Sequence, residues 1–199
     1  MDPQFVLQIA LALFGGVVIA ATTGLRAFLP LFALGLSGRF GWWPVEAHLK
    51  WMQSDLALIA LGAATVIEIA GDKIPVVDHA LDAVGTLVRP IAGIVGSFVV
   101  LQAIPAPWGQ MIALAFGGVT LGVHSLKAKT RIGSSVATLG TGNPILSVVE
   151  DSLAVLGTVL ALLMPFLGFV VVFVAVALLA RAVSRPGAMA QPPQGRAAV

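Results

Sequence analysis

The chain of 199 residues is 58% hydrophobic and only 10% charged, whereas soluble domains carry about 25% charged residues. This composition excludes a soluble globular protein, and a net charge of +2 is too small to favour nucleic acid as a partner. The absence of cysteine excludes disulfides and thiolate-bound metals.

Apolar stretches recur along almost the whole chain, so we expect an all-α integral membrane protein with a single transmembrane domain over residues 1–183. Asp2 and no basic residue precede the first stretch, so we interpret it as a true helix and not as a cleaved signal. Residues 184–199 are rich in Pro, Gly and Ala, and we expect a disordered cytoplasmic tail there. About six stretches can form membrane-crossing helices, at 5–23, 55–72, 90–105, 110–126, 147–164 and 166–181.

Two further segments are too short or too polar to cross a bilayer. The first, 26–38, is a short apolar segment with Pro30 inside it, and the second, 131–146, is rich in Gly, Ser and Thr. Irregular backbone at membrane depth is tolerated only where protein or water covers it. We therefore expect two short broken or re-entrant helices.

Each of these segments begins with an arginine and is followed by a helix that contains a glutamate. Arg26 and Glu68 flank the first segment in this way, and Arg131 and Glu150 flank the second. The first helix corresponds to the one at 110–126, and three crossings from one to the other reverse the direction of the chain. The order therefore predicts an inverted repeat with pseudo-repeats at 5–88 and 90–181. Coincidence between two hydrophobic halves is the alternative.

The distribution of charge predicts the orientation. The loop 39–55 contains three tryptophans among charged residues, which is typical of a segment at headgroup level. The positive-inside rule makes the opposite, more basic side cytoplasmic. We therefore expect a protein of the bacterial inner membrane with both termini on the cytoplasmic side. If residues 26–38 cross instead, the N-terminus changes sides. The basic side holds Lys73, Arg89, Lys127, Lys129, Arg131, Arg181, Arg185 and Arg196.

The helix that starts at Asp55 contains the first embedded acids. A rise of 1.5 Å per residue places Glu68 roughly 20 Å along this helix, and Asp72 follows four residues later on the same face. A carboxylate at such a depth costs about 2.5–3.5 kcal/mol and needs a partner, a cavity or an ion. Pro75 is expected to end the helix, and Asp78 to cap a short helix over 79–88.

The second polar segment ends in a strong helix start, Asn143 followed by Pro144. Glu150 then lies about 10 Å into the helix, next to Asp151. We expect Arg131 to neutralise Glu150 or Asp151, and Arg26 to neutralise Glu68 or Asp72. Such pairs can be structural clamps or a functional site, and both interpretations stay open.

Glycine pairs indicate close helix packing, either within one chain or between two copies in a homodimer. These pairs are Gly93 with Gly96 and Gly118 with Gly122.

Three stretches resemble a bacterial membrane family known only as domain of unknown function 4126. They are "GLRAFLPL" from residue 24, "EIAGDKIPVVDHALDAVGTLVRPIAG" from residue 68 and "NPILSVVEDSLAVL" from residue 143. The resemblance extends over residues 10–165 and implies no activity. It does imply a shared polar set of Arg26, Glu68, Asp72, Lys73, Asp78, Arg89, Arg131, Asn143, Ser147, Glu150 and Asp151.

We favour a small transporter that uses embedded carboxylates to couple a proton or small cation to an unknown small solute, with the lipid bilayer as its surroundings and no cofactor. One alternative is an enzyme acting on a lipid or polyprenyl phosphate, with a divalent metal held by Asp72, Asp78 and Asp82. The other is a structural or lipid-handling membrane protein. We predict binding residues at Arg26, Glu68, Asp72, Arg131, Asn143, Ser147, Glu150 and Asp151, with secondary roles for Lys73, Asp78 and Arg89.

Overall fold

A computed structural model describes residues 2–184, apart from the side chains of four residues at the start of one helix, which are Pro75, Val76, Asp78 and His79. The predicted tail from residue 185 lies outside the described residues. All regular structure in the described part is helical, which confirms the predicted fold class. The helices are α1 (Pro3–Leu25), α2 (Phe28–Arg39), α3 (Asp55–Gly71), α4 (Pro75–Val100), α5 (Trp108–Thr138), α6 (Asn143–Leu163) and α7 (Pro165–Val183), with short 3-10 helices at Ala47–Gln53 and Leu101–Ala103.

Five helices, α1, α4, α5, α6 and α7, are long and apolar enough to cross a membrane. A sixth crossing arises if α3 is taken with the 3-10 helix before it, which meets α3 at 60°. The multi-pass membrane architecture expected from the sequence is therefore confirmed, with five to six apolar spans.

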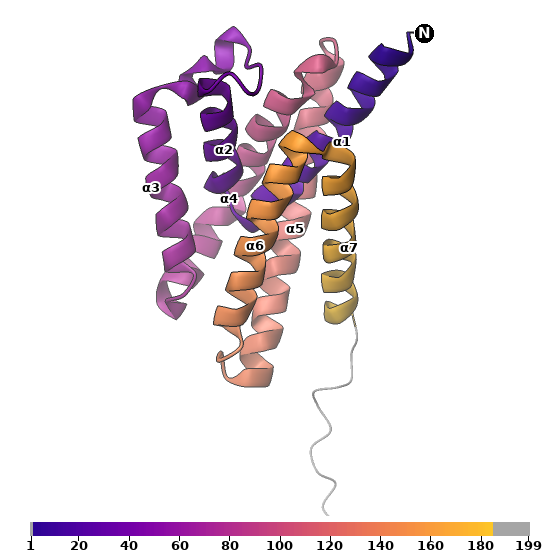
Figure 1. Ribbon diagram of the computed structural model, residues 1–199. Coiled ribbons are helices and arrows are strands. Elements are labelled where there is room, and N and C mark those ends of the chain that lie inside the picture. The colour runs from indigo at the N-terminus through magenta and orange to yellow at the C-terminus, as the bar shows by residue number, and fades with distance from the viewer. Residues whose placement is uncertain (1, 185–199) are drawn as a thin grey trace, which may run out of the picture.

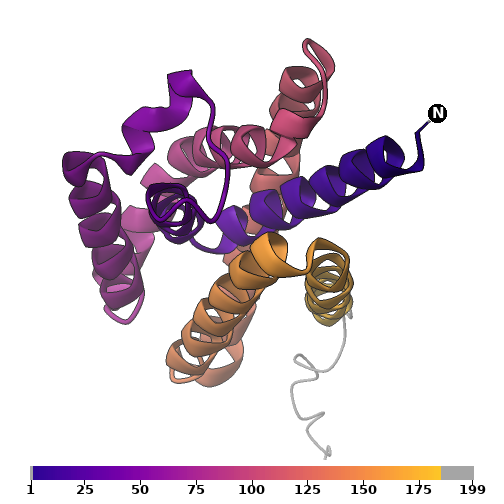
Figure 2. The ribbon, with the colours of Figure 1, turned by 45° about the horizontal axis from the view of Figure 1, so that its top comes forward.

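The first two helices form a V whose point lies inside the bundle (Figure 1). Helix α1 descends from the N-terminal end into the bundle, and its last turns are buried on all sides from Val18 to Leu25. Arg26 then adopts an extended conformation that ends the helix, and α2 returns toward the starting end. With 12 residues, α2 is too short to cross a bilayer, as predicted for residues 26–38. Seen from a second direction, α1 lies between α4 on one side and α6 and α7 on the other (Figure 2).

The remaining helices run alternately down and up the bundle, and their directions bear on two predictions (Figure 1). Helices α1 and α5 run the same way, whereas corresponding helices of an inverted repeat run in opposite directions. The parallel directions of α1 and α5 do not support the inverted repeat, which stays a prediction. The start of α1 and the end of α7 also lie at opposite ends of the bundle, because the V of α1 and α2 enters and leaves at one end. This arrangement differs from the expectation that both termini share one side.

The second predicted broken segment, 131–146, is wrong. Helix α5 continues without interruption to Thr138, a short turn follows, and α6 begins at Asn143. The polar side chains do not break the helix because their hydroxyls bond back to it: Thr130 donates to the carbonyl of Leu126, and Thr138 to that of Ser134. The turn is made by Leu139 and Gly140, both with positive φ.

The predicted short helix over 79–88 is also wrong, because α4 is one helix of 26 residues that includes Pro90. Its N-cap position is Ile74 and Pro75 is in its first turn, so Asp78 lies inside the helix, with a side chain outside the described residues. A proline within a membrane helix is tolerated where neighbouring helices support the backbone. Helix α4 has such support, because it packs against α1 and α5.

The two glycine pairs have different surroundings. A Cβ atom added at Gly93 would lie 1.9 Å from Thr120 Oγ1, and one at Gly96 would lie 2.9 Å from a side-chain carbon of Ile19. These glycines therefore allow α4 to approach α5 and α1 closely. A Cβ atom added at Gly118 or Gly122 would have no atom from another part of the described structure within 4 Å, so these two glycines face outward.

Candidate functional site

Charged side chains from five parts of the chain meet inside the bundle, at the point of the V. We call this set the charge network. Its members are the cations Arg26, Arg89, Lys127 and Arg131 and the carboxylates Glu68, Asp72, Glu150 and Asp151. All are buried except Asp151, whose side chain is 19% exposed.

Asp72 is the centre of the charge network. It lies in the turn after α3, and a single oxygen, Oδ2, accepts hydrogen bonds from Arg26, from Lys127 Nζ at 3.0 Å and from an Arg131 nitrogen at 2.8 Å. Burial opposes ionisation of this carboxyl group, but the three surrounding cations stabilise its negative charge. The second oxygen, Oδ1, is buried without a hydrogen-bond partner among the described residues.

Arg26 joins the end of α1 to α3 and α6. Besides Asp72, its guanidinium contacts Asp151 at 2.6 Å and donates to the hydroxyl of Ser147 at 3.2 Å. Lys127 adds a second link, because its ammonium donates to the carbonyl of Leu25 at 3.3 Å. The last carbonyl groups of a helix have no partner within the helix, so Lys127 satisfies one of them at the end of α1.

Glu68 caps α2 from a neighbouring helix. Its two carboxylate oxygens accept the backbone N–H groups of Ala27 at 3.0 Å and Phe28 at 3.3 Å. No side chain at the N-cap position of α2 does this, and a negative charge is favourable at a helix N-terminus. Arg89 donates to the same carboxylate at 3.2 Å. The charge network therefore holds both helix ends at the point of the V.

Arg89 also connects the charge network to α5. One of its nitrogens contacts Asp82 at 3.4 Å and the Nδ1 atom of His124. The other ring nitrogen of His124 lies 3.3 Å from the hydroxyl of Thr86. His124 was not among the residues predicted from the sequence, and Lys127 was predicted only as a charge that sets the orientation. Their spacing could have revealed them, because positions 124, 127 and 131 share one face of a helix.

Arg131 pairs with Glu150, as the sequence predicted, with one nitrogen 2.5 Å from an oxygen of Glu150. The network reaches the surface through Asp151, which lies 3.4 Å from the ammonium group of Lys73. Since the side chain of Lys73 is 43% exposed, the contact between Lys73 and Asp151 is where the charge network is most accessible from the surface.

The structure thus brings together seven of the eight predicted binding residues, although their binding role stays a prediction. The exception is Asn143, which donates to Ser135 at 2.8 Å and makes no contact with the charge network. Helix α6 begins at Asn143, as predicted, but the N-cap position is Gly142, so the side chain of Asn143 does not cap the helix as an N-cap asparagine would. Of the secondary residues, Arg89 is a member of the charge network, Lys73 contacts it through Asp151, and the side chain of Asp78 lies outside the described residues.

A polar cavity lies beside the charge network, between α4, α5 and α6. It has a volume of about 390 Å³, and its lining includes Asp82, Arg131, Ser135 and Asn143. The Oδ1 atom of Asn143 is buried without a hydrogen-bond partner among the described residues. Arg131 and Asp82 connect this cavity to the network.

The described residues contain no group of three histidine or acidic side chains arranged to hold a metal ion. Of the predicted metal ligands, Asp72 is surrounded by cations and Asp82 pairs with Arg89. This electrostatic setting disfavours a divalent cation at Asp72.

Comparisons with curated proteins and with solved structures find no match. The family model described as domain of unknown function (DUF4126) matches residues 13–185. This range includes the whole charge network and all seven helices except the first turns of α1. The chain therefore belongs to the DUF4126 family.

Proposed function

We propose that the protein is a small membrane carrier, in which the charge network closes the path of a small polar solute. A proton or small cation binds to the carboxylates of the network and couples to the movement of this solute. One observation carries the proposal: four cations and four carboxylates meet at the break between α1 and α2, inside helices of membrane-spanning length. Buried ionisable groups in such helices are expensive and mark solute or ion pathways.

Stability alone gives little reason for this arrangement. The removal of charges from water costs several kcal/mol per ion, and apolar side chains of similar volume often stabilise a protein as well or better. A bundle that only needed a rigid centre could be packed with apolar residues. The free-energy cost of burying eight charged groups therefore favours a functional role, in which these groups change partners.

The broken helix supports the same interpretation. In many carriers, the ends of half-helices lie at the solute site and provide groups that bind charge. Here Lys127 holds the C-terminal end of α1 and Glu68 holds the N-terminal end of α2. A change of partners in the charge network would therefore act directly on both ends of the break.

The balance of charge suggests how a proton could act. With all eight groups ionised, the four positive and four negative charges cancel. Protonation of one carboxylate leaves the network with one excess positive charge, which favours the binding of an anionic solute group or a change of partners. Asp151 is the best candidate for this step, because its carboxylate is the most exposed of the four and contacts Arg26. The polar cavity beside Arg131 gives a small solute room to approach the same centre.

Proton flux into liposomes tests the proposal. The purified protein is reconstituted with a pH-sensitive dye inside the vesicles, and an acid pulse is applied to wild type, Asp151→Asn, Glu150→Gln and the control Glu46→Gln. Glu46 is an exposed loop residue outside the charge network. We expect wild type and the control to acidify the vesicles faster than empty liposomes do.

The expected effect of Asp151→Asn is a rate at least tenfold lower, in protein that still elutes as a folded species from gel filtration. Glu150→Gln should also lower the rate. Equal rates in all four proteins, or a wild-type rate equal to that of empty liposomes, would contradict the proposal and favour a purely structural network.

A further inference from the structure

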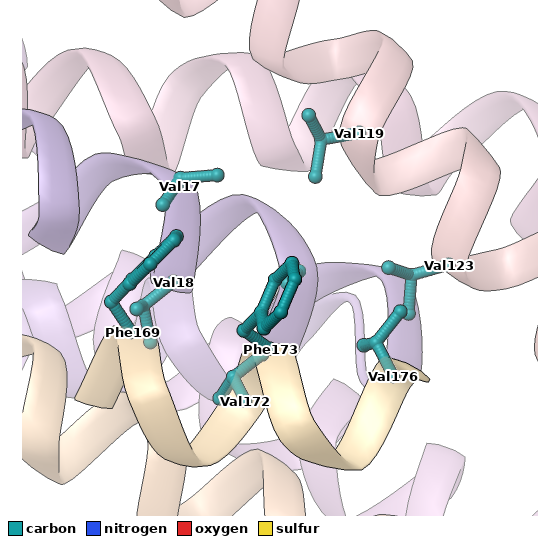
Figure 3. Close-up of a pocket in the computed structure, with 9 residues that line it drawn as sticks. Val17, Val18, Val119, Val123, Phe169, Val172, Phe173 and Val176 are labelled. Carbon is teal, nitrogen blue, oxygen red and sulfur yellow. The ribbon is translucent and has the colours of Figure 1, made fainter. Parts of the chain in front are cut away.

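Two pockets lie one after the other between α5 and α7, away from the charge network. The first is an apolar crevice of about 110 Å³ lined only by valine, alanine and phenylalanine side chains of α1, α5 and α7. Figure 3 shows Val119 and Val123 on one side of this crevice, with Phe173 and Val176 of α7 opposite them. The side chain of Phe173 is 62% exposed, so the crevice borders the surface that faces lipid.

The second pocket lies at the ends of α5 and α7, where the start of α6 also lines it, and it is partly polar. It has a volume of about 440 Å³, and its lining includes Lys129 and Ser134 of α5 and Val183 of α7. Neither the ammonium group of Lys129 nor the hydroxyl group of Ser134 has a partner in the part of the chain that the structure describes. Two hydrogen-bond donors, one of them positively charged, are therefore available there.

The helical repeat places the two pockets one after the other along α5 and α7, and we refer to the pair of pockets as a groove. Positions 119, 123, 130 and 134 share one face of α5, and positions 169, 176 and 183 share one face of α7. From Val119 to Thr130 the rise along α5 is about 16 Å. This length is close to half of the ~30 Å hydrocarbon core, which is the depth of one leaflet.

We propose that this groove binds a phospholipid with an anionic headgroup. One acyl chain lies in the apolar crevice, and the phosphate accepts hydrogen bonds from Lys129 and Ser134. Charge complementarity favours this occupant, because Lys129 lines the second pocket and Arg181 is exposed in the last turn of α7, whose end also lines it, and basic residues near a membrane surface attract anionic lipids. The site is separate from the proposed carrier function and does not depend on it.

Native mass spectrometry of the detergent-solubilised full chain, titrated with phosphatidylglycerol or phosphatidylethanolamine, tests the site. The variants are Lys129→Gln, which removes the charge, and Val176→Trp, which fills the crevice. Their controls are Lys50→Gln, at an exposed lysine of the tryptophan-containing loop, and Val174→Trp, on the outward face of α7.

Wild type and both controls should bind one phosphatidylglycerol more tightly than phosphatidylethanolamine. Lys129→Gln should weaken phosphatidylglycerol binding about fivefold, which corresponds to ~1 kcal/mol for one lysine, and should remove the preference between the two lipids. Val176→Trp should weaken binding of both lipids at least tenfold.

Several results would overturn the proposal. One is equal affinity for both lipids in wild type and Lys129→Gln, a readout that does not depend on how well the tryptophan variant folds. Another is a shift from dimer to monomer in Val176→Trp with unchanged lipid binding, which would identify a second copy as the occupant. A gain of lipid binding when the chain is shortened after Ser184 would identify the tail as the occupant instead.

Discussion

Asp72 has the most demanding surroundings of any residue in the charge network, because three cations share one of its oxygens. In Asp72→Asn these cations keep their charges and lose their common anion. Since removal of one partner from a buried ion pair costs about 3–5 kcal/mol, we predict a loss of that size in the free energy of unfolding. Denaturation in detergent, followed by circular dichroism, measures it.

The matched control for this prediction is Asp55→Asn at the other end of α3. Asp55 pairs with Arg39 at 2.5 Å, but its side chain is 79% exposed, and exposed pairs contribute about 0–1 kcal/mol. A similar loss in both variants would show that Asp72 is not the centre of a buried network.

The pairing of Arg131 with Glu150 could be predicted from the sequence because both residues interrupt apolar stretches and lie close together along the chain. Lys127 and Arg89 could not be assigned in this way. Each lies near a predicted helix end, where a basic residue usually faces the headgroups, and only the packing of α4 and α5 against α1 shows that both are buried. His124 carries no charge in its neutral form, so charge counting overlooks it.

At the scale of the helices, the contact between α4 and α5 depends on Gly93. A methyl group there would overlap with Thr120, which is buried and bonded to the carbonyl of Ala20 in α1. Overpacking of this kind costs about 1–3 kcal/mol, so we predict that Gly93→Ala lowers the free energy of unfolding by that amount. A thermal melt of the purified variant in detergent measures the change.

Gly118→Ala is the matched control, because Gly118 also lies within a helix but has open space around it. Alanine has the higher helix propensity by up to about 1 kcal/mol, so this variant should be as stable as wild type or more stable. A loss of stability from Gly118→Ala would mean that its face of α5 is covered by another chain.

Hydropathy predicted the crossing helices well, because a length of about 20 apolar residues is a direct requirement of the bilayer. Local composition predicted the two breaks unequally: the short segment after Arg26 is confirmed, whereas the break within 131–146 is wrong. The polar residues of 131–146 are compatible with a helix because serine and threonine hydroxyls bond to carbonyls of the preceding turn, as Thr130 and Thr138 do. The break at Arg26, in contrast, is stabilised by Glu68 and Lys127 from distant helices, and no local signal could define that geometry.

At the scale of the whole molecule, the V of α1 and α2 determines which end of the bundle holds the N-terminus. Charge counting could not decide this point, because only the N-terminus and Arg26 change sides between the two topologies. The structure places the start of α1 at the same end as the loop 40–54, and the turn between α5 and α6 at the other end (Figure 1). The polar cavity lies between α4, α5 and α6, near that turn.

The proposed carrier requires a charge network that is closed to water and a neighbouring cavity that is reached only from the end of the bundle with the α5–α6 turn. Reaction of single cysteines with a membrane-impermeant thiol reagent, in sealed vesicles of known orientation, tests this requirement most directly. The chain has no native cysteine, so each label reports one site. Lys50→Cys and Leu139→Cys mark the two ends of the bundle, Ser135→Cys probes the cavity and Ser147→Cys probes the network.

We predict that Ser135→Cys reacts from the side of Leu139→Cys and not from the side of Lys50→Cys. Ser147→Cys should stay unmodified from both sides, because Ser147 is fully buried against Arg26. Reaction of Ser147→Cys as fast as that of Leu139→Cys, or of Ser135→Cys from the side of Lys50→Cys, would contradict a closed network with one-sided access.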